Sequence, residues 1–86
     1  MMAEELEIGR VMDYFARIGV AGLDLTGTLR VGDRIHVKGH TTDFEQVVQS
    51  MQVEHEPVQE AKEGDKIGIK IAERCRGGDT VFRIVP

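Results

Sequence analysis

The chain has few of the residues that cross-link, anchor or export a protein. Its 86 residues include one cysteine, Cys75, so no intrachain disulfide can form and a reducing compartment is favoured. No apolar run approaches the roughly 18 residues of a membrane-spanning helix. The start, Met1 to Glu7, is acidic where a signal peptide would be basic. The sequence therefore predicts a cytoplasmic protein with no membrane contact.

Motifs for nucleotide, metal and covalent chemistry are also missing. The phosphate-binding pattern Gly-x-x-x-x-Gly-Lys-Ser/Thr does not occur, so we expect no GTP binding by this chain itself. A zinc site needs three or four convergent ligands, and the only histidines beside the single cysteine are His36, His40 and His55, which lack such a spacing. Cys75 has no histidine nearby in the sequence to act as a base. We predict no catalytic residue, no metal and no cofactor, and hence a non-enzymatic protein.

Short alternating segments and ten glycines dominate what remains. A chain of this length makes one domain with a modest core. The clearest strand pattern is residues 66–71, where isoleucine at every second position alternates with lysine or glycine. Residues 20–25 and 34–38 alternate in the same way. Many short strands joined by glycine turns predict an all-β domain, and closure into a barrel would remove exposed sheet edges.

One dipeptide recurs at three strand entrances: Gly32-Asp33, Gly64-Asp65 and Gly78-Asp79. Each is followed one residue later by a β-branched apolar residue, and the unequal separations exclude a sequence repeat. Glycine can adopt the positive φ that a tight turn requires, and aspartate can accept a backbone N–H bond. We predict the same turn three times, which gives these aspartates a structural role in place of a catalytic or metal-binding one.

The first apolar segment, residues 8–15, does not alternate cleanly. Ile8 and Val11 are three residues apart, so they share a strand face only if a bulge occurs near Gly9-Arg10. An amphipathic helix over residues 4–17 is the competing interpretation, and we favour the strand.

Residues 44–53 are long enough for one curved strand, with Val47, Met51 and Val53 on one face. Residues 54–65 are acidic and irregular, with space for a single helical turn. The alternation as a whole predicts one core made of Ala21, Leu23, Leu25, Leu29, Ile35, Val37, Val47, Met51, Ile67, Ile69 and Ile71.

The stretch Leu25–Gly39 carries a resemblance to a known family. Its signature Gly-x-Leu-x-x-Gly-Asp-x-Ile is similar to a turn and strand in domain 2 of the translational GTPases, the small β-barrel that follows the GTP-binding domain of elongation and initiation factors. Further segments resemble strands of that barrel in the same order: Ile8–Val11, Val20–Leu25, Val47–Met51 and Ala61–Ile69. We therefore expect residues 1–7 to be a flexible N-terminus and residues 8–86 to form a single small closed antiparallel β-barrel.

The resemblance implies a free-standing, elongation factor-like binding module that acts with the translation apparatus, so the ribosome or structured RNA becomes the implied partner. Arginine can pair phosphates and stack on bases, and the candidate RNA-binding residues are Arg30, Arg34, Arg74 and Arg76. The net charge of −4 and pI of about 5.3 give little attraction for RNA. The alternative is a protein–protein interaction module with no RNA contact. A similar barrel also occurs as an accessory domain at the end of some collagenase-like peptidases.

Overall fold

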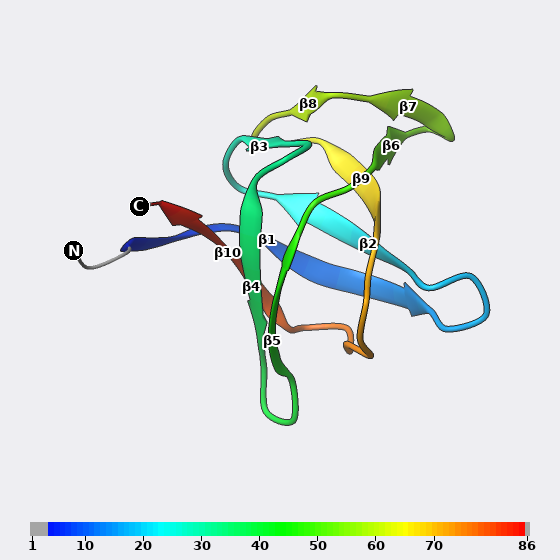
Figure 1. The fold of residues 1–86 in the computed structure, drawn as a ribbon. Coiled ribbons are helices and arrows are strands. Elements are labelled where there is room, and N and C mark those ends of the chain that lie inside the picture. Colours follow the sequence, from blue (N-terminus) through cyan, green and yellow to red (C-terminus); the bar gives the residue numbers. More distant parts are fainter. Residues whose placement is uncertain (1–3, 86) are drawn as a thin grey trace.

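A computed structural model describes residues 4–85, and its regular elements are all strands (Figure 1). They are β1 (Glu4–Phe15), β2 (Val20–Leu25), β3 (Leu29–Arg30), β4 (Arg34–Lys38), β5 (Asp43–Val47), β6 (Met51–Val53), β7 (Glu56–Val58), β8 (Glu60–Ala61), β9 (Lys66–Lys70) and β10 (Thr80–Val85). Every ladder is antiparallel, which confirms the predicted all-β, antiparallel class. Within residues 4–85 no helix is long and apolar enough to cross a membrane.

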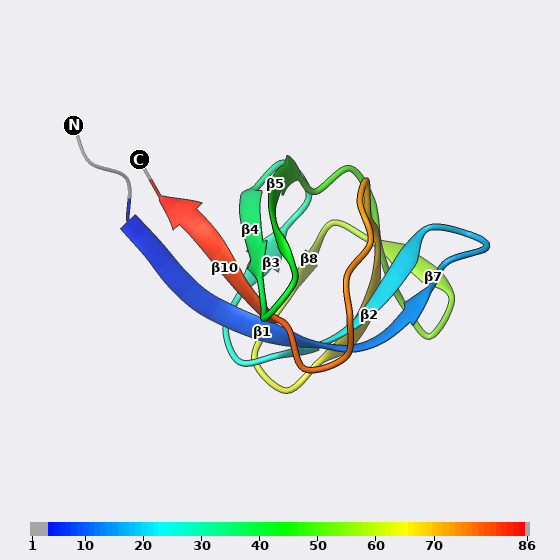
Figure 2. The ribbon, with the colours of Figure 1, turned by 90° about the horizontal axis from the view of Figure 1, so that it is seen from below.

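One curled sheet of eight strands surrounds the core, in the order β5-β4-β10-β1-β2-β9-β6-β7, and β3 pairs with β8 separately (Figure 2). Between residues 4 and 85 no ladder joins β5 to β7, so the predicted closed barrel is not confirmed. A side chain connects β5 to the end of β9 instead. The Gln46 amide donates to the carbonyl oxygen of Lys70 at 2.7 Å and accepts from the N–H of Ala72 at 2.7 Å.

The strand prediction for residues 8–15 is confirmed, and β1 also includes residues 4–7. Those four residues, expected in a flexible N-terminus, pair with β10, while residues 1–3 lie outside the described part of the chain. The register of β1 against β10 shifts between Glu7 and Gly9, where the bulge was predicted. Ile8 and Val11 are accordingly both buried. A second shift, against β2, occurs between Val11 and Asp13.

The predicted core is correct at ten of its eleven positions, and Val47 is the exception. Val47 is 43% exposed, whereas its neighbour Val48 is 1% exposed. Phe44 occupies an inward position of β5, so alternation turns Val47 outward. Val48 follows the strand end, where its N–H donates to the carbonyl oxygen of Asp33 at 2.8 Å. Residues 44–53 are consequently two strands, β5 and β6, and the prediction of one long strand was wrong.

Residues 54–65 contain β7 and β8 where a helical turn was expected. The hairpin between β6 and β7 turns through Glu54 and His55, whose φ angles are 51° and 67°. Positive φ at both central residues is typical of the tight two-residue turn that matches strand twist.

The three Gly-Asp turns are confirmed in detail. Gly32, Gly64 and Gly78 have φ angles of 98°, 93° and 96°. In each turn the aspartate carboxylate accepts the N–H of the residue three positions earlier, at 2.9, 3.0 and 2.8 Å. The aspartate N–H also donates to that residue's carbonyl oxygen. All three aspartates therefore hold turns, as the sequence predicted.

Candidate functional site

The four predicted RNA-binding arginines do not form one continuous surface. Arg30 forms an ion pair with Glu60, and Arg34 donates from Nε to Glu45 at 3.1 Å. Arg74 and Arg76 are exposed in the 71–79 loop between β9 and β10. Two of the four positive charges are thus each beside a carboxylate, which reduces the potential that a phosphate would experience.

The strand register shows how far apart the two arginine pairs lie. Thr80, next to the 71–79 loop, pairs with Lys38 at the end of β4, whereas Ile84 pairs with Arg34 at its beginning. Figure 1 likewise places β3 at the opposite end of the molecule from that loop. The structure therefore places Arg30 and Arg34 at one end of the β4–β10 ladder, and Arg74 and Arg76 at the other.

Cys75 lies in the same loop but points into the core, where it is 2% exposed. Burial, with a smaller contribution from Asp79, raises the pKa of the Cys75 thiol to about 11. Because the thiolate is the nucleophilic form, this environment disfavours reactivity at neutral pH.

His36 of β4 forms the most connected titratable cluster that the structure describes. Its Nε2 contacts Asp43 at 2.5 Å and its Nδ1 contacts Glu5 at 2.8 Å, with Phe82 alongside. The pKa of His36 is raised from its ordinary value, chiefly by the hydrogen bond that its ring donates to the Asp43 carboxylate, and against the opposing effect of burial. Two carboxylates on a single imidazole link β1, β4 and β5 and act as a structural clamp.

Because of this clamp, we expect the free energy of unfolding to depend on pH. A raised folded pKa means that protonated His36 contributes stability below the unfolded pKa of about 6.5, and that the contribution is lost as pH rises through the folded value. We expect the wild type to be more stable below this window than above it, and Asp43→Asn to show a smaller difference. NMR titration of the imidazole checks the cause: a wild-type pKa at or below about 6.5 would contradict it.

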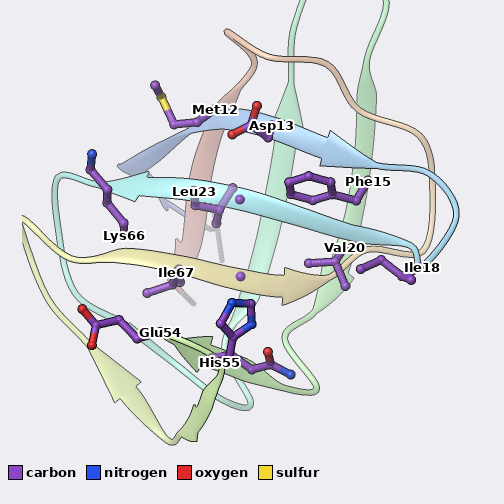
Figure 3. A pocket seen from close by; sticks show the side chains of 13 residues that line it. Met12, Asp13, Phe15, Ile18, Val20, Leu23, Glu54, His55, Lys66 and Ile67 are labelled. Carbon is purple, nitrogen blue, oxygen red and sulfur yellow. The ribbon is translucent and has the colours of Figure 1, made fainter.

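A groove of about 590 Å³ opens on the outer face of the β1–β2–β9–β6 part of the sheet (Figure 3). The residues that line it are Met12, Asp13, Phe15, Ile18, Val20, Gly22, Leu23, Gln52, Glu54, His55, Lys66, Ile67 and Gly68. In Figure 3, Phe15, Val20 and Ile18 gather at one end, while Lys66 and Glu54 lie at the other. Its volume is within the usual range of ligand sites, about 300–1,000 Å³.

Three of the five exposed large hydrophobic side chains among residues 4–85 lie along this groove. Met12 is 51% exposed, Phe15 50% and Ile18 62%. The sequence interpretation missed this site, because it assigned these residues to the first strand and its turn and did not bring them together as one surface. The available signal was glycine inside two strand patterns, at Gly22 and Gly68.

A model of the elongation factor Tu domain 2 family matches residues 20–81 of this chain. The chain belongs to the elongation factor Tu domain 2 family. The predicted resemblance to domain 2 of translational GTPases is therefore confirmed for the domain itself.

The relatives found for this family member are peptidases by name. An uncharacterized protease of Methanocaldococcus jannaschii is 40% identical over 79 residues, which is 91% of this chain and 19% of that protein. A collagenase of Porphyromonas gingivalis is 33% identical over 82 residues, or 93% of this chain and 20% of that protein. The chain thus spans about a fifth of the length of these curated relatives.

Solved structures support the same fold. The C-terminal domain of a Geobacillus thermoleovorans putative U32 peptidase superposes with a TM-score of 0.85 at 20% identity, covering 92% of this chain and 91% of that one. Its selenomethionine variant gives a TM-score of 0.83 at 19% identity, with 87% and 95% coverage. None of the relatives named here is an elongation factor, so they give the predicted translational role no support.

Proposed function

We propose that this chain is a binding domain that works with a peptidase of the U32 kind and supplies protein contacts to it, without taking part in peptide-bond hydrolysis. The observation that carries the proposal is the coverage. About nine-tenths of this chain corresponds to about a fifth of each relative named protease or collagenase. A unit of that size, similar in fold to a domain described as C-terminal, is suited to an accessory role.

The chemistry of the chain supports a binding role over a catalytic one. Its single thiol is buried with a raised pKa, and its best-connected histidine is held between two carboxylates. The aspartates of the Gly-Asp turns are occupied by backbone N–H groups. An exposed apolar groove is, by contrast, a feature that commonly marks contact with another molecule.

RNA binding at Arg30, Arg34, Arg74 and Arg76 remains the alternative, with the ribosome or structured RNA as partner. The ion pairs at Arg30 and Arg34 and the distribution of the four residues over two ends of a ladder favour the protein-binding role.

A domain exchange tests the proposed function. In the Porphyromonas gingivalis collagenase, the matching segment is deleted or replaced by this chain, and hydrolysis of denatured collagen is compared with hydrolysis of a short fluorogenic peptide. We expect deletion to raise KM for denatured collagen several-fold while kcat/KM for the short peptide changes less than about twofold. This chain should restore part of the lost affinity.

Circular dichroism of each variant checks that the remainder of the enzyme stays folded. If the folded deletion variant loses hydrolysis of the short peptide as well, the domain takes part in catalysis and the proposal is wrong. It is equally wrong if deletion leaves KM for denatured collagen unchanged.

A further inference from the structure

Two glycines lie side by side in the floor of the groove, and the packing of the chain does not require glycine at either position. Gly22 of β2 pairs directly with Gly68 of β9, and neither has a positive φ. A Cβ added at Gly22 would have its nearest neighbour at 3.8 Å, and one at Gly68 would have it at 3.5 Å, which are ordinary van der Waals distances. The contrast is Gly39, where a Cβ would lie 1.9 Å from a carboxylate oxygen of Asp79.

Glycine inside a strand weakens it, by roughly 0.5–1 kcal/mol relative to alanine. A glycine that internal packing and backbone conformation do not explain often marks a place where another backbone or a ligand approaches closely. The Gly22–Gly68 pair exposes the main chain of two adjacent strands. An external chain can therefore reach van der Waals contact with the sheet at this point.

The ends of the groove differ in chemistry. Phe15 and Ile18 form an apolar end, and both are at least half exposed. Asp13, two residues before Phe15 on β1, pairs with Gly22 and lies beside the glycine floor. Glu54 adds a second carboxylate, against the single lysine, Lys66. The groove therefore combines an apolar wall with an excess of negative charge.

From this arrangement we infer that the groove binds an extended polypeptide segment, with an apolar side chain and a lysine or arginine two positions apart. In an extended chain, residues i and i+2 face the same side about 6.6 Å apart, the spacing at which Phe15 and Asp13 follow each other on β1. The apolar side chain lies against Phe15 and Ile18, and the basic one reaches Asp13. The inference that the ligand is a polypeptide rests on the proposed function.

The position of the groove suits this occupant. Glu4 and Val85, which pair with each other, lie at the start of β1 and the end of β10, while the groove residues Met12 to Phe15 are at the far end of β1 (Figure 1). A straight strand of 12 residues spans about 36 Å from its first to its last Cα, and β1 curves between its ends (Figure 2). The groove therefore lies away from the paired ends of β1 and β10.

RNA fits the groove less well. The groove carries two carboxylates and one lysine, and none of the four candidate arginines lines it. A polyanion would be repelled by that balance of charge, whereas a basic peptide is attracted.

Fluorescence anisotropy with labelled probes tests the inference. The probe is a nine-residue glycine–serine peptide carrying a central Leu-Ser-Lys; its controls carry Leu-Ser-Glu or Ser-Ser-Lys, and an oligoadenylate of ten nucleotides represents RNA. We expect the Leu-Ser-Lys peptide to bind most tightly. Gly68→Val should weaken that binding at least tenfold, because the valine fills the floor, and Asp13→Asn should remove the preference for lysine over glutamate.

Lys38→Val is the matched control, since it adds a valine to an exposed strand position of β4 outside the groove; it should change binding by less than twofold. Thermal unfolding verifies that Gly68→Val remains folded. The inference is overturned if folded Gly68→Val binds the peptide like the wild type, if no peptide binds, or if only the oligoadenylate responds to Gly68→Val.

The collagenase exchange keeps the two proposals separate. If chimeras carrying the wild-type chain and the Gly68→Val chain restore affinity for denatured collagen equally, peptide binding in the groove is refuted and the proposed function is sustained. Peptide binding that depends on Gly68, in a chain that restores nothing to the collagenase, would refute the proposed function alone.

Discussion

Ile69→Ala is expected to lower the free energy of unfolding by about 2–4 kcal/mol. Ile69 is 1% exposed and lies at the centre of the curled sheet, paired with Ala21 of β2 and Met51 of β6. Truncation removes three buried carbon atoms and leaves a cavity among strands whose hydrogen bonds limit collapse. In a domain of this size each kcal/mol lowers Tm by about 4–8 °C.

Urea denaturation measures the change, and Ile18→Ala is the matched control. Ile18 is 62% exposed in the turn between β1 and β2, so the identical truncation there should cost less than about 0.5 kcal/mol. Equal losses for the two variants would show that Ile69 does not occupy the core as described.

Gly39→Ala is expected to destabilise the protein by about 1–3 kcal/mol, whereas Gly68→Ala should leave stability unchanged or raise it by up to about 1 kcal/mol. The added Cβ at position 39 meets the carboxylate of Asp79 at 1.9 Å, and Asp79 is itself buried and accepts the N–H of Arg76. The added Cβ therefore displaces a buried carboxylate whose hydrogen bond holds the turn. At position 68 the Cβ meets only Val20, at 3.5 Å.

The same urea experiment compares the two alanine variants. The difference between their free energies of unfolding is the informative quantity. Each variant replaces one glycine by alanine, so the effect on the entropy of the unfolded chain is the same in both. If Gly68→Ala costs as much as Gly39→Ala, then the fold itself requires glycine at position 68, and a ligand is no longer needed to explain it.

Features encoded locally were predictable from the sequence. The Gly-Asp turns depend on two adjacent residues, and all three formed with the expected carboxylate bonds. The alternation of residues 66–71 fixes which side chains enter the core, whatever their partners. The bulge near Gly9 followed from the requirement that Ile8 and Val11 be buried together.

Features that depend on contacts between distant segments were predicted less well. Val47 and Val48 are adjacent and equally apolar, and the choice between them is made by the inward position of Phe44 and by the bond from Val48 to Asp33. The connection from β5 to β9 runs through the side chain of Gln46, a polar residue with no apolar pattern to reveal it. Closure of the sheet is likewise a property of strand order, which alternation does not encode.

The candidate site shows the same difference between features encoded locally and features set by contacts between distant segments. Arginines were selected by residue type, and the structure then separated them and paired two of them with glutamates. The groove depends on Gly22 and Gly68 lying opposite each other on neighbouring strands. The two residues are 46 positions apart in the sequence, so their pairing is set by the register between β2 and β9. Each glycine alone is unremarkable in a chain that has ten.

An amide chemical-shift map of the ¹⁵N-labelled protein, titrated in parallel with the Leu-Ser-Lys peptide and with oligoadenylate, tests the central claim most directly. A protein-binding domain that uses the groove predicts peptide-induced shifts concentrated in residues 12–22, 52–55 and 66–68, with little response to RNA. Shifts produced by RNA at Arg30, Arg34, Arg74 and Arg76, with the groove residues unaffected by the peptide, would contradict it.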